Sequence, residues 1–89
     1  MLGLKSYELE PVYDRTKSFY HKAKVQEWHG NVRLQSYNTI VAEIKDGKPI
    51  IYGTYSATTL RHIKEFLQQN GFKIGTKNEI LKWYGVEKW

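Results

Sequence analysis

The chain has 89 residues, enough for one hydrophobic core and therefore one domain, residues 1–89. It contains no cysteine, which excludes disulfides, thiolate catalysis and cysteine-ligated zinc or iron–sulfur sites. The formal net charge of +5 favours an acidic partner, such as nucleic acid or an acidic protein surface.

The N-terminal residues do not resemble a targeting signal. They carry Glu8 and Glu10 and lack the basic stretch and the apolar run of a signal peptide. No segment approaches the ~20 apolar residues that cross a bilayer. Because a small secreted domain usually needs disulfides, we expect a cytoplasmic protein that does not enter the membrane.

Turn residues divide the chain into four parts, of which the first two are 1–17 and 18–55. Residues 1–17 show no sustained hydrophobic period, and we interpret them as an irregular N-terminal arm packed on the body through Leu2, Leu4, Leu9 and Val12. Residues 18–55 alternate between polar and apolar side chains, which predicts a β-meander.

Two hairpin turns set the register of this meander. A two-residue turn at His29-Gly30 places Val25 opposite Leu34, apolar beside apolar. Asp46-Gly47 is a second signal of the same type, and Pro49 after it indicates an edge strand.

The polar stretch Ser36-Tyr37-Asn38 interrupts the middle of the meander. We interpret it as a bulge or bend within one long strand. The second turn then places Ile51 opposite Ala42 on the inner face. The meander is therefore predicted to have three antiparallel strands.

The third part, residues 56–72, predicts the main helix, from Ala57 to Gln69. Residues near Ser56 are candidate N-caps, and Asn70-Gly71 is a typical helix end. We expect the stripe formed by Leu60, Ile63 and Leu67 to cover the inner face of the sheet. That face is predicted to contain Val25, Leu34, Ile40 and Ala42.

The fourth part, residues 76–85, predicts a short C-terminal helix, because Thr76 and Glu79 have the spacing of a capping box and Gly85 follows as a stop. The predicted fold is therefore α+β. It consists of a three-stranded antiparallel β-meander packed against one main α-helix, plus a short C-terminal helix and an irregular N-terminal arm.

Four segments of the chain share a recognisable pattern: Tyr13-Asp14-Arg15, Lys17-Ser18-Phe19-Tyr20, Ser36-Tyr37-Asn38-Thr39 and the run YSATTLRHIKEFL from Tyr55 to Leu67. Together they resemble a family of small proteins of unknown function encoded by bacteriophages, plasmids and other mobile elements of bacteria. The resemblance implies an accessory protein of a mobile element. It implies no reaction and no cofactor.

The outer face of the meander combines basic and aromatic side chains. Parity places Lys24 and Arg33 on the same face as Trp28, and Val41 and Ile50 continue it. Such a surface can stack bases between cations, and it can equally anchor a protein. Alternatively, the N-terminal arm or the C-terminal helix covers part of it. The residues predicted to contact a partner are Lys22, Lys24, Trp28, Arg33, Tyr37 and Tyr52.

The start of the main helix is a second candidate site. Free amides at a helix N-terminus, hydroxyl groups and an arginine can together bind an anion such as phosphate. The candidate residues are Ser56, Thr58, Thr59 and Arg61. The alternative is structural: the hydroxyl groups cap the helix, and Arg61 pairs with Glu65 one turn further on.

No pattern typical of catalysis or metal binding is present. His21, His29 and His62 lack metal-ligand spacing, and the carboxylates are scattered. We expect no enzymatic activity, no catalytic residues, no metal and no cofactor.

The predicted function is that of a non-enzymatic accessory protein of a phage or mobile element. It would bind and inhibit or modulate a host protein, such as a nuclease-based defence complex. The alternative is a small nucleic-acid-binding or regulatory module that uses the same basic and aromatic sheet face.

Overall fold

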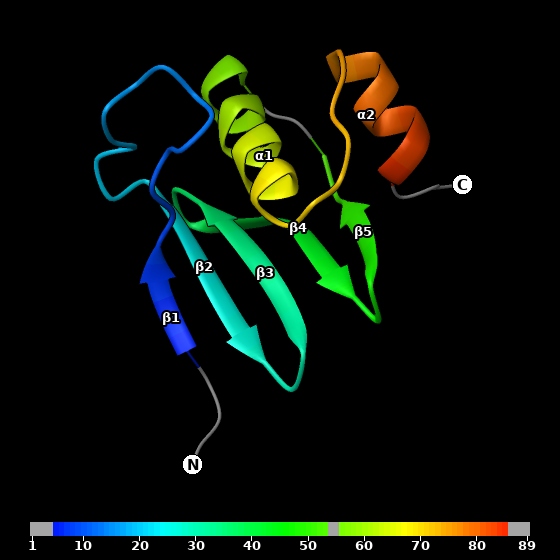
Figure 1. Cartoon of the computed structure of the whole chain (residues 1–89), viewed down its shortest axis with the longest axis horizontal. Helices are drawn as coiled ribbons and strands as arrows, with labels where there is room; N and C mark the ends of the chain where they lie inside the picture. The colour runs from blue at the N-terminus through cyan, green and yellow to red at the C-terminus, as the bar shows by residue number, and fades with distance from the viewer. Residues whose placement is uncertain (1–4, 54–55, 86–89) are drawn as a thin grey trace.

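A computed structural model describes residues 5–53 and 56–85. Within these ranges the chain forms one five-stranded antiparallel sheet, in the order β1-β2-β3-β4-β5, and two helices (Figure 1). The elements are β1 (Lys5–Glu8), β2 (Ala23–Trp28), β3 (Asn31–Ser36), β4 (Thr39–Lys45), β5 (Lys48–Ile51), α1 (Ala57–Gln69) and α2 (Lys77–Tyr84).

The predicted three-stranded meander is wrong, although the α+β class agrees with the structure. The polar stretch after β3 is a hairpin turn and not a bend within a strand, because Ser36 pairs with Thr39. Tyr37, in this turn, adopts a left-handed φ of 57°. A bulky residue rarely takes this conformation, so local sequence preference does not indicate the turn.

The fifth strand comes from the N-terminal arm. Residues Lys5–Glu8 form β1 and pair along β2, and the Tyr7 hydroxyl donates a hydrogen bond to Glu27. Of the predicted arm contacts, Leu9 is buried, whereas Val12 is 68% exposed, so its predicted packing is wrong. Leu2 and Leu4 lie outside the described residues.

The predicted hairpin registers are confirmed. Val25 pairs with Leu34, and Ala42 pairs with Ile51. His29-Gly30 and Asp46-Gly47 have positive φ at both positions, as type I′ turns require.

A β-bulge changes the expected faces of two apolar residues. The register between β3 and β4 shifts after Leu34, so that Gln35 pairs with Ile40 and Val41 is the extra residue. Val41 is completely buried, although it was predicted on the outer face. Ile40 shares the outer face with Gln35 and is only half-buried, so the prediction that it contacts the helix is wrong.

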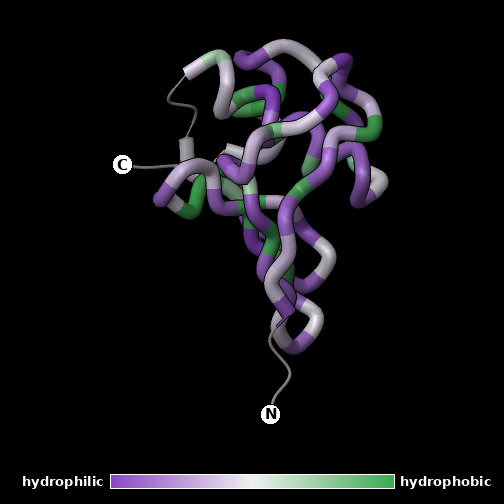
Figure 2. Tube along the Cα trace, turned by 90° about the vertical axis from the view of Figure 1, so that its left-hand side faces the viewer, coloured by the Kyte–Doolittle hydropathy of each residue, from purple (hydrophilic) through white to green (hydrophobic). Residues whose placement is uncertain are grey.

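Figure 1 shows α1 over the strands β3 and β4 and α2 beside β5. Ile63, Phe66 and Leu67 of α1 are fully buried against the inner face of the sheet, and Leu60 is partly buried. From the side, the helices gather at one end of the sheet, and the strands taper toward the β2–β3 turn (Figure 2). The core therefore lies between α1 and the inner sheet face.

The helix ends follow the predicted capping chemistry. Ser56 is the N-cap of α1, and its hydroxyl accepts a hydrogen bond from the Thr59 amide at 3.1 Å. Gly71 has a φ of 85°, and the Phe72 amide donates to the Leu67 carbonyl at 2.9 Å. The capping box of Thr76 and Glu79 at the start of α2 is present.

The segment after β1 is attached to α1 by a buried carboxylate. Glu65 is 1% exposed and accepts hydrogen bonds from the backbone amides of Val12 and Asp14 at 2.7 and 2.9 Å, and from that of Tyr13 between them. Gln69 donates a further bond to it. Several donors thus compensate the charge, as a buried carboxylate requires. The predicted pairing of Glu65 with Arg61 is wrong.

We expect Leu67→Ala to lower the free energy of unfolding by ~2–4 kcal/mol, because Leu67 is completely buried between α1 and the sheet. Chemical denaturation measures this loss. A loss below about half a kcal/mol, the size typical of a surface substitution, would contradict this packing.

We expect Glu65→Ala to leave the three amides of residues 12–14 without their acceptor and to lower the free energy of unfolding by about 2–3 kcal/mol. Amide hydrogen exchange should show lost protection at these residues, with β3 and β4 still protected. Glu10→Ala, an exposed carboxylate in the same segment, is the control and should change neither. Retained protection in Glu65→Ala would show that the carboxylate does not hold the segment.

Candidate functional site

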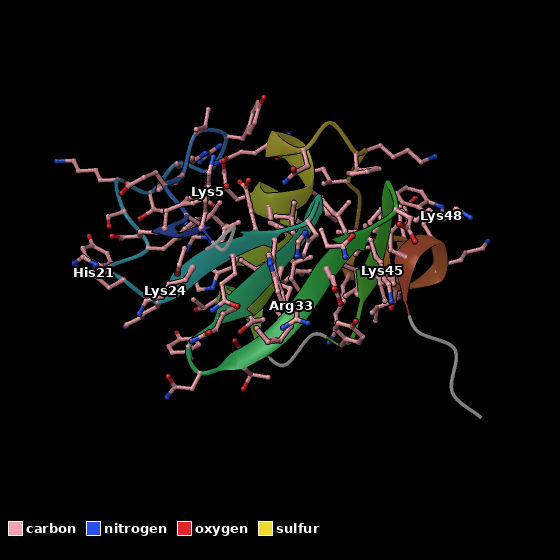
Figure 3. All side chains as sticks on the ribbon, turned by 90° about the horizontal axis from the view of Figure 1, so that it is seen from below. Lys5, His21, Lys24, Arg33, Lys45 and Lys48 are labelled. Carbon is pink, nitrogen blue, oxygen red and sulfur yellow. The ribbon has the colours of Figure 1, made fainter. Side chains whose placement is uncertain are left out.

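The face of the sheet opposite α1 carries four of the six residues predicted to contact a partner. They are Lys24, Trp28, Arg33 and Tyr52. We define the outer sheet face as these four together with Gln26, Gln35, Ile40, Glu43 and Ile50. Figure 3 looks onto this face, with Lys24, Arg33 and Lys45 along it and α1 behind the sheet.

A small polar network lies in the middle of the outer sheet face. Arg33 Nε is 3.6 Å from Glu43 Oε2, and the Tyr52 hydroxyl donates to Glu43 Oε1 at 2.7 Å. The hydrogen bond to Glu43 raises the pKa of Tyr52 above its usual value, and burial adds to the shift. Arg33 is thus partly compensated, and a carboxylate stands at the centre of a face that was expected to be basic.

A shallow pocket of about 60 Å³ adjoins this network. It is lined by Gln26, Trp28, Asn31, Arg33 and Glu43. Trp28 is 55% exposed, and its ring lies beside that of His29, with centroids 4.8 Å apart and the ring planes tilted by 35°. The pocket therefore offers hydrogen-bond donors, a carboxylate acceptor and an aromatic surface within one small area.

Lys22 and Tyr37 lie elsewhere. Both line a second pocket, of about 190 Å³, formed between the loop 16–22, Tyr37 and the first two turns of α1. We call it the α1-start pocket. The Lys22 ammonium lies 5.7 Å from the centroid of the Tyr37 ring. Thr58 and Arg61, predicted as parts of an anion site, line the same pocket.

Arg61 is paired with Asp14 of the N-terminal segment. Its Nε donates to Asp14 Oδ2 at 3.0 Å, and its Nη2 binds Oδ1. The hydrogen bonds from Arg61 lower the pKa of Asp14 from 3.8 to about 2, with a smaller contribution from the Thr16 amide. This two-pronged geometry is typical of arginine with a carboxylate. It leaves the remaining guanidinium N–H groups for other acceptors.

Ser56 and Thr59 belong to a chain of hydroxyl groups that runs from the exposed N-cap of α1 into the core. Ser56 Oγ is 3.3 Å from Thr59 Oγ1, which is 3.1 Å from Ser36 Oγ. Ser36 Oγ in turn lies 2.9 Å from His62 Nδ1. Both Ser36 and Thr59 are almost fully buried, so their bonds hold α1 to the end of β3.

His62 was not singled out as a site residue by the sequence. It is 1% exposed, it lines the α1-start pocket, and its ring contacts Phe19 edge-on with centroids 4.6 Å apart. Burial lowers the pKa of His62, and the positive charges of Arg61 and Lys22 contribute. With Nδ1 bonded to Ser36, Nε2 has no hydrogen-bond partner among the described residues.

The loop residues of the pocket other than Lys22 were also missed, because no local spacing connects residues 16–22 to residues 58–62. The segments that carry the family resemblance do meet there: Ser18 and Tyr20 come from one, Tyr37 from another, and Thr58 and Arg61 from the YSATTLRHIKEFL run. That coincidence is the one signal in the sequence that could have grouped them.

In residues 5–53 and 56–85, no three His, Asp or Glu side chains gather into a group able to hold a metal ion. Neither of the two helices found in these ranges is long and apolar enough to span a membrane.

The chain belongs to a protein family of unknown function, DUF8033, whose model matches residues 7–82. No curated protein and no solved structure matches the chain significantly. The matched range includes the outer sheet face and the α1-start pocket.

We expect Arg61→Gln to raise the pKa of Asp14 from about 2 toward its usual 3.8, because the main cause of the lowering is removed. Since the folded-state pKa is depressed, the pair stabilises the protein above about pH 4, and this contribution is lost as the pH falls through about 2. An NMR titration of the Asp14 carboxyl measures the shift. Arg15→Gln is the matched control and should leave it unchanged. A value still near 2 in Arg61→Gln would exclude the ion pair.

Proposed function

We propose that this protein is a non-enzymatic binding protein of a phage or another mobile element, and that its outer sheet face docks on a protein of the host bacterium. The main support is the part of that face where exposed Trp28, at the end of β2, lies beside the Arg33–Glu43 pair. Tryptophan, tyrosine and arginine carry most of the binding energy at protein interfaces. The mobile-element setting, and a nuclease-based defence complex as the class of target, rest on the sequence resemblance.

The central carboxylate favours a protein over a nucleic acid. The Glu43 side chain is 13% exposed and lies among the cross-strand neighbours Arg33 and Ile50. A phosphate backbone crossing this face would approach the carboxylate and lose electrostatic energy. A protein can instead bind with a donor group over Glu43 and an acceptor beside Arg33.

The geometry of the buried hydroxyl groups supports a binding role without catalysis. Ser36 and His62 have the 2.9 Å contact of a nucleophile and its base. The Ser36 hydroxyl is only 2% exposed and also contacts Thr59, so a substrate carbonyl cannot approach it. The bond between Ser36 and His62 therefore joins α1 to the end of β3.

The test is the double variant Trp28→Ala/Arg33→Ala, compared with the wild type in capture experiments from host lysate. We expect the captured partner to be lost, because truncating two interface anchors together weakens binding by about a hundredfold or more. The melting temperature should change by only a few degrees, since both side chains are more than half exposed.

Tyr13→Ala is the control, because Tyr13 is an exposed aromatic residue of the segment held to α1, away from the outer sheet face. It should retain the partner. Loss of capture in Tyr13→Ala, with normal capture by the double variant, would overturn the proposal.

Nuclease treatment and a salt titration separate the two classes of partner. A protein partner should survive nuclease and weaken little with salt. Binding that disappears with nuclease and falls steeply with salt concentration would assign the face to nucleic acid.

A further inference from the structure

The α1-start pocket combines hydrogen-bond donors and a cation, and none of the described residues that line it is a carboxylate. Its volume of about 190 Å³ is several times the roughly 30 Å³ share of one water molecule, so it can admit a group as large as a phosphate. The pocket is separate from the outer sheet face, so its chemistry does not depend on the function proposed for that face.

Two charged groups make the pocket electropositive. Lys22 forms no ion pair among the described residues; its described contact is the Tyr37 ring, at 5.7 Å. Arg61 gives two of its N–H groups to Asp14 and retains others. Because Asp14 balances the charge of Arg61, Lys22 supplies the net positive charge, and Arg61 adds directed donors.

Neutral donors complete the arrangement. The Ser18 hydroxyl oxygen accepts a hydrogen bond from the Tyr20 amide at 2.8 Å, which leaves its proton available. The Thr58 hydroxyl also lines the pocket. His62 is 1% exposed with Nδ1 bonded to Ser36, so Nε2 is a buried polar atom of a pocket-lining residue without a partner in the described chain. A buried polar atom of this kind normally has a hydrogen-bond partner.

The backbone around the pocket is held in an unfavourable conformation. Tyr20, His21 and Tyr37 have φ values of 54°, 65° and 57°. The two turns are fastened together, because the Tyr37 amide donates to the Lys22 carbonyl at 2.7 Å. Bulky residues keep left-handed backbones only where the surrounding structure imposes them, and such positions concentrate at ligand sites.

We propose that the α1-start pocket binds a ligand that carries a phosphate group. Lys22 and Arg61 contact the phosphate oxygens, the Ser18 and Thr58 hydroxyls donate to them, and His62 Nε2 provides the buried contact. A tetrahedral anion with several acceptor oxygens matches convergent donors of this kind. The exposed Tyr20 and Tyr37 rings at the pocket can in addition stack on a flat organic group.

The experiment is an NMR titration of the ¹⁵N-labelled full chain with inorganic phosphate, glycerol phosphate and adenosine monophosphate, at constant ionic strength against sodium chloride. We expect saturable shifts of the Lys22, Tyr37 and Thr58 amides, with a dissociation constant below about 10 mM for at least one probe. Tighter binding of the nucleotide would assign the ligand to phosphates with an aromatic ring. Equal binding of all three would assign recognition to the phosphate alone.

Lys22→Gln should weaken binding by about tenfold or more, because it removes the cation that has no counter-ion. Lys24→Gln is the matched control: it removes the same charge two residues away, on the outer sheet face, and should leave the affinity within about twofold. Both residues are exposed, so both variants should fold.

Three results would overturn the proposal: no saturable shift up to about 10 mM of any probe, equal weakening by the two lysine variants, or shifts confined to residues outside the pocket. The variant Trp28→Ala/Arg33→Ala should bind phosphate as the wild type does. Failure of the sheet-face proposal and failure of the phosphate proposal are therefore distinguishable.

Discussion

The attachment of the N-terminal segment to α1 depends on the buried carboxylate of Glu65. Burial of an unpaired carboxylate costs several kcal/mol unless hydrogen bonds replace its hydration. Here three consecutive backbone amides, those of residues 12–14, point at one side chain of the helix, and Gln69 adds a fourth residue as donor. This is a nest of backbone dipoles around an anion, assembled between segments more than fifty residues apart.

The Asp14–Arg61 ion pair and the α1-start pocket both depend on this attachment. With residues 12–14 held at α1, the Asp14 carboxylate lies within reach of Arg61, one turn before Glu65. The chain then continues through the loop 16–22, which closes one side of the α1-start pocket before it enters β2. The pocket therefore exists only because the segment that precedes β2 crosses the start of the helix.

The same arrangement leaves the outer sheet face uncovered by either described helix, because both helices and the N-terminal segment occupy the other side and one end of the sheet (Figures 1 and 3). Two surfaces of different character result. The outer sheet face presents Trp28 beside the ion pair of Arg33 and Glu43, in which the two charges balance. The α1-start pocket instead brings hydrogen-bond donors together near the charge of Lys22, which is unpaired among the described residues. Lys22 and Lys24 lie on different surfaces although they are two residues apart, because Lys24 belongs to β2 whereas Lys22 follows the turn at Tyr20 and His21 that precedes the strand.

Local chemistry in the sequence determined α1, both caps, and the turns at His29-Gly30 and Asp46-Gly47, because helical spacing, hydroxyl caps and glycine act over a few residues. The sequence also placed Lys24, Trp28 and Arg33 on the outer face, because the register of one hairpin is enough to assign its alternating side chains to the two faces.

Only the tertiary structure decided the remaining features. The turn at Tyr37 adopts a backbone conformation that its sequence disfavours, and the pairing of β1 joins residues on either side of a long loop. The bulge at Val41 exchanges the faces predicted for Ile40 and Val41. The pocket is also tertiary, because it joins the loop 16–22 to α1 across some forty residues. In each case the stabilising contacts join residues that are distant in sequence, and local conformational preferences do not predict such contacts.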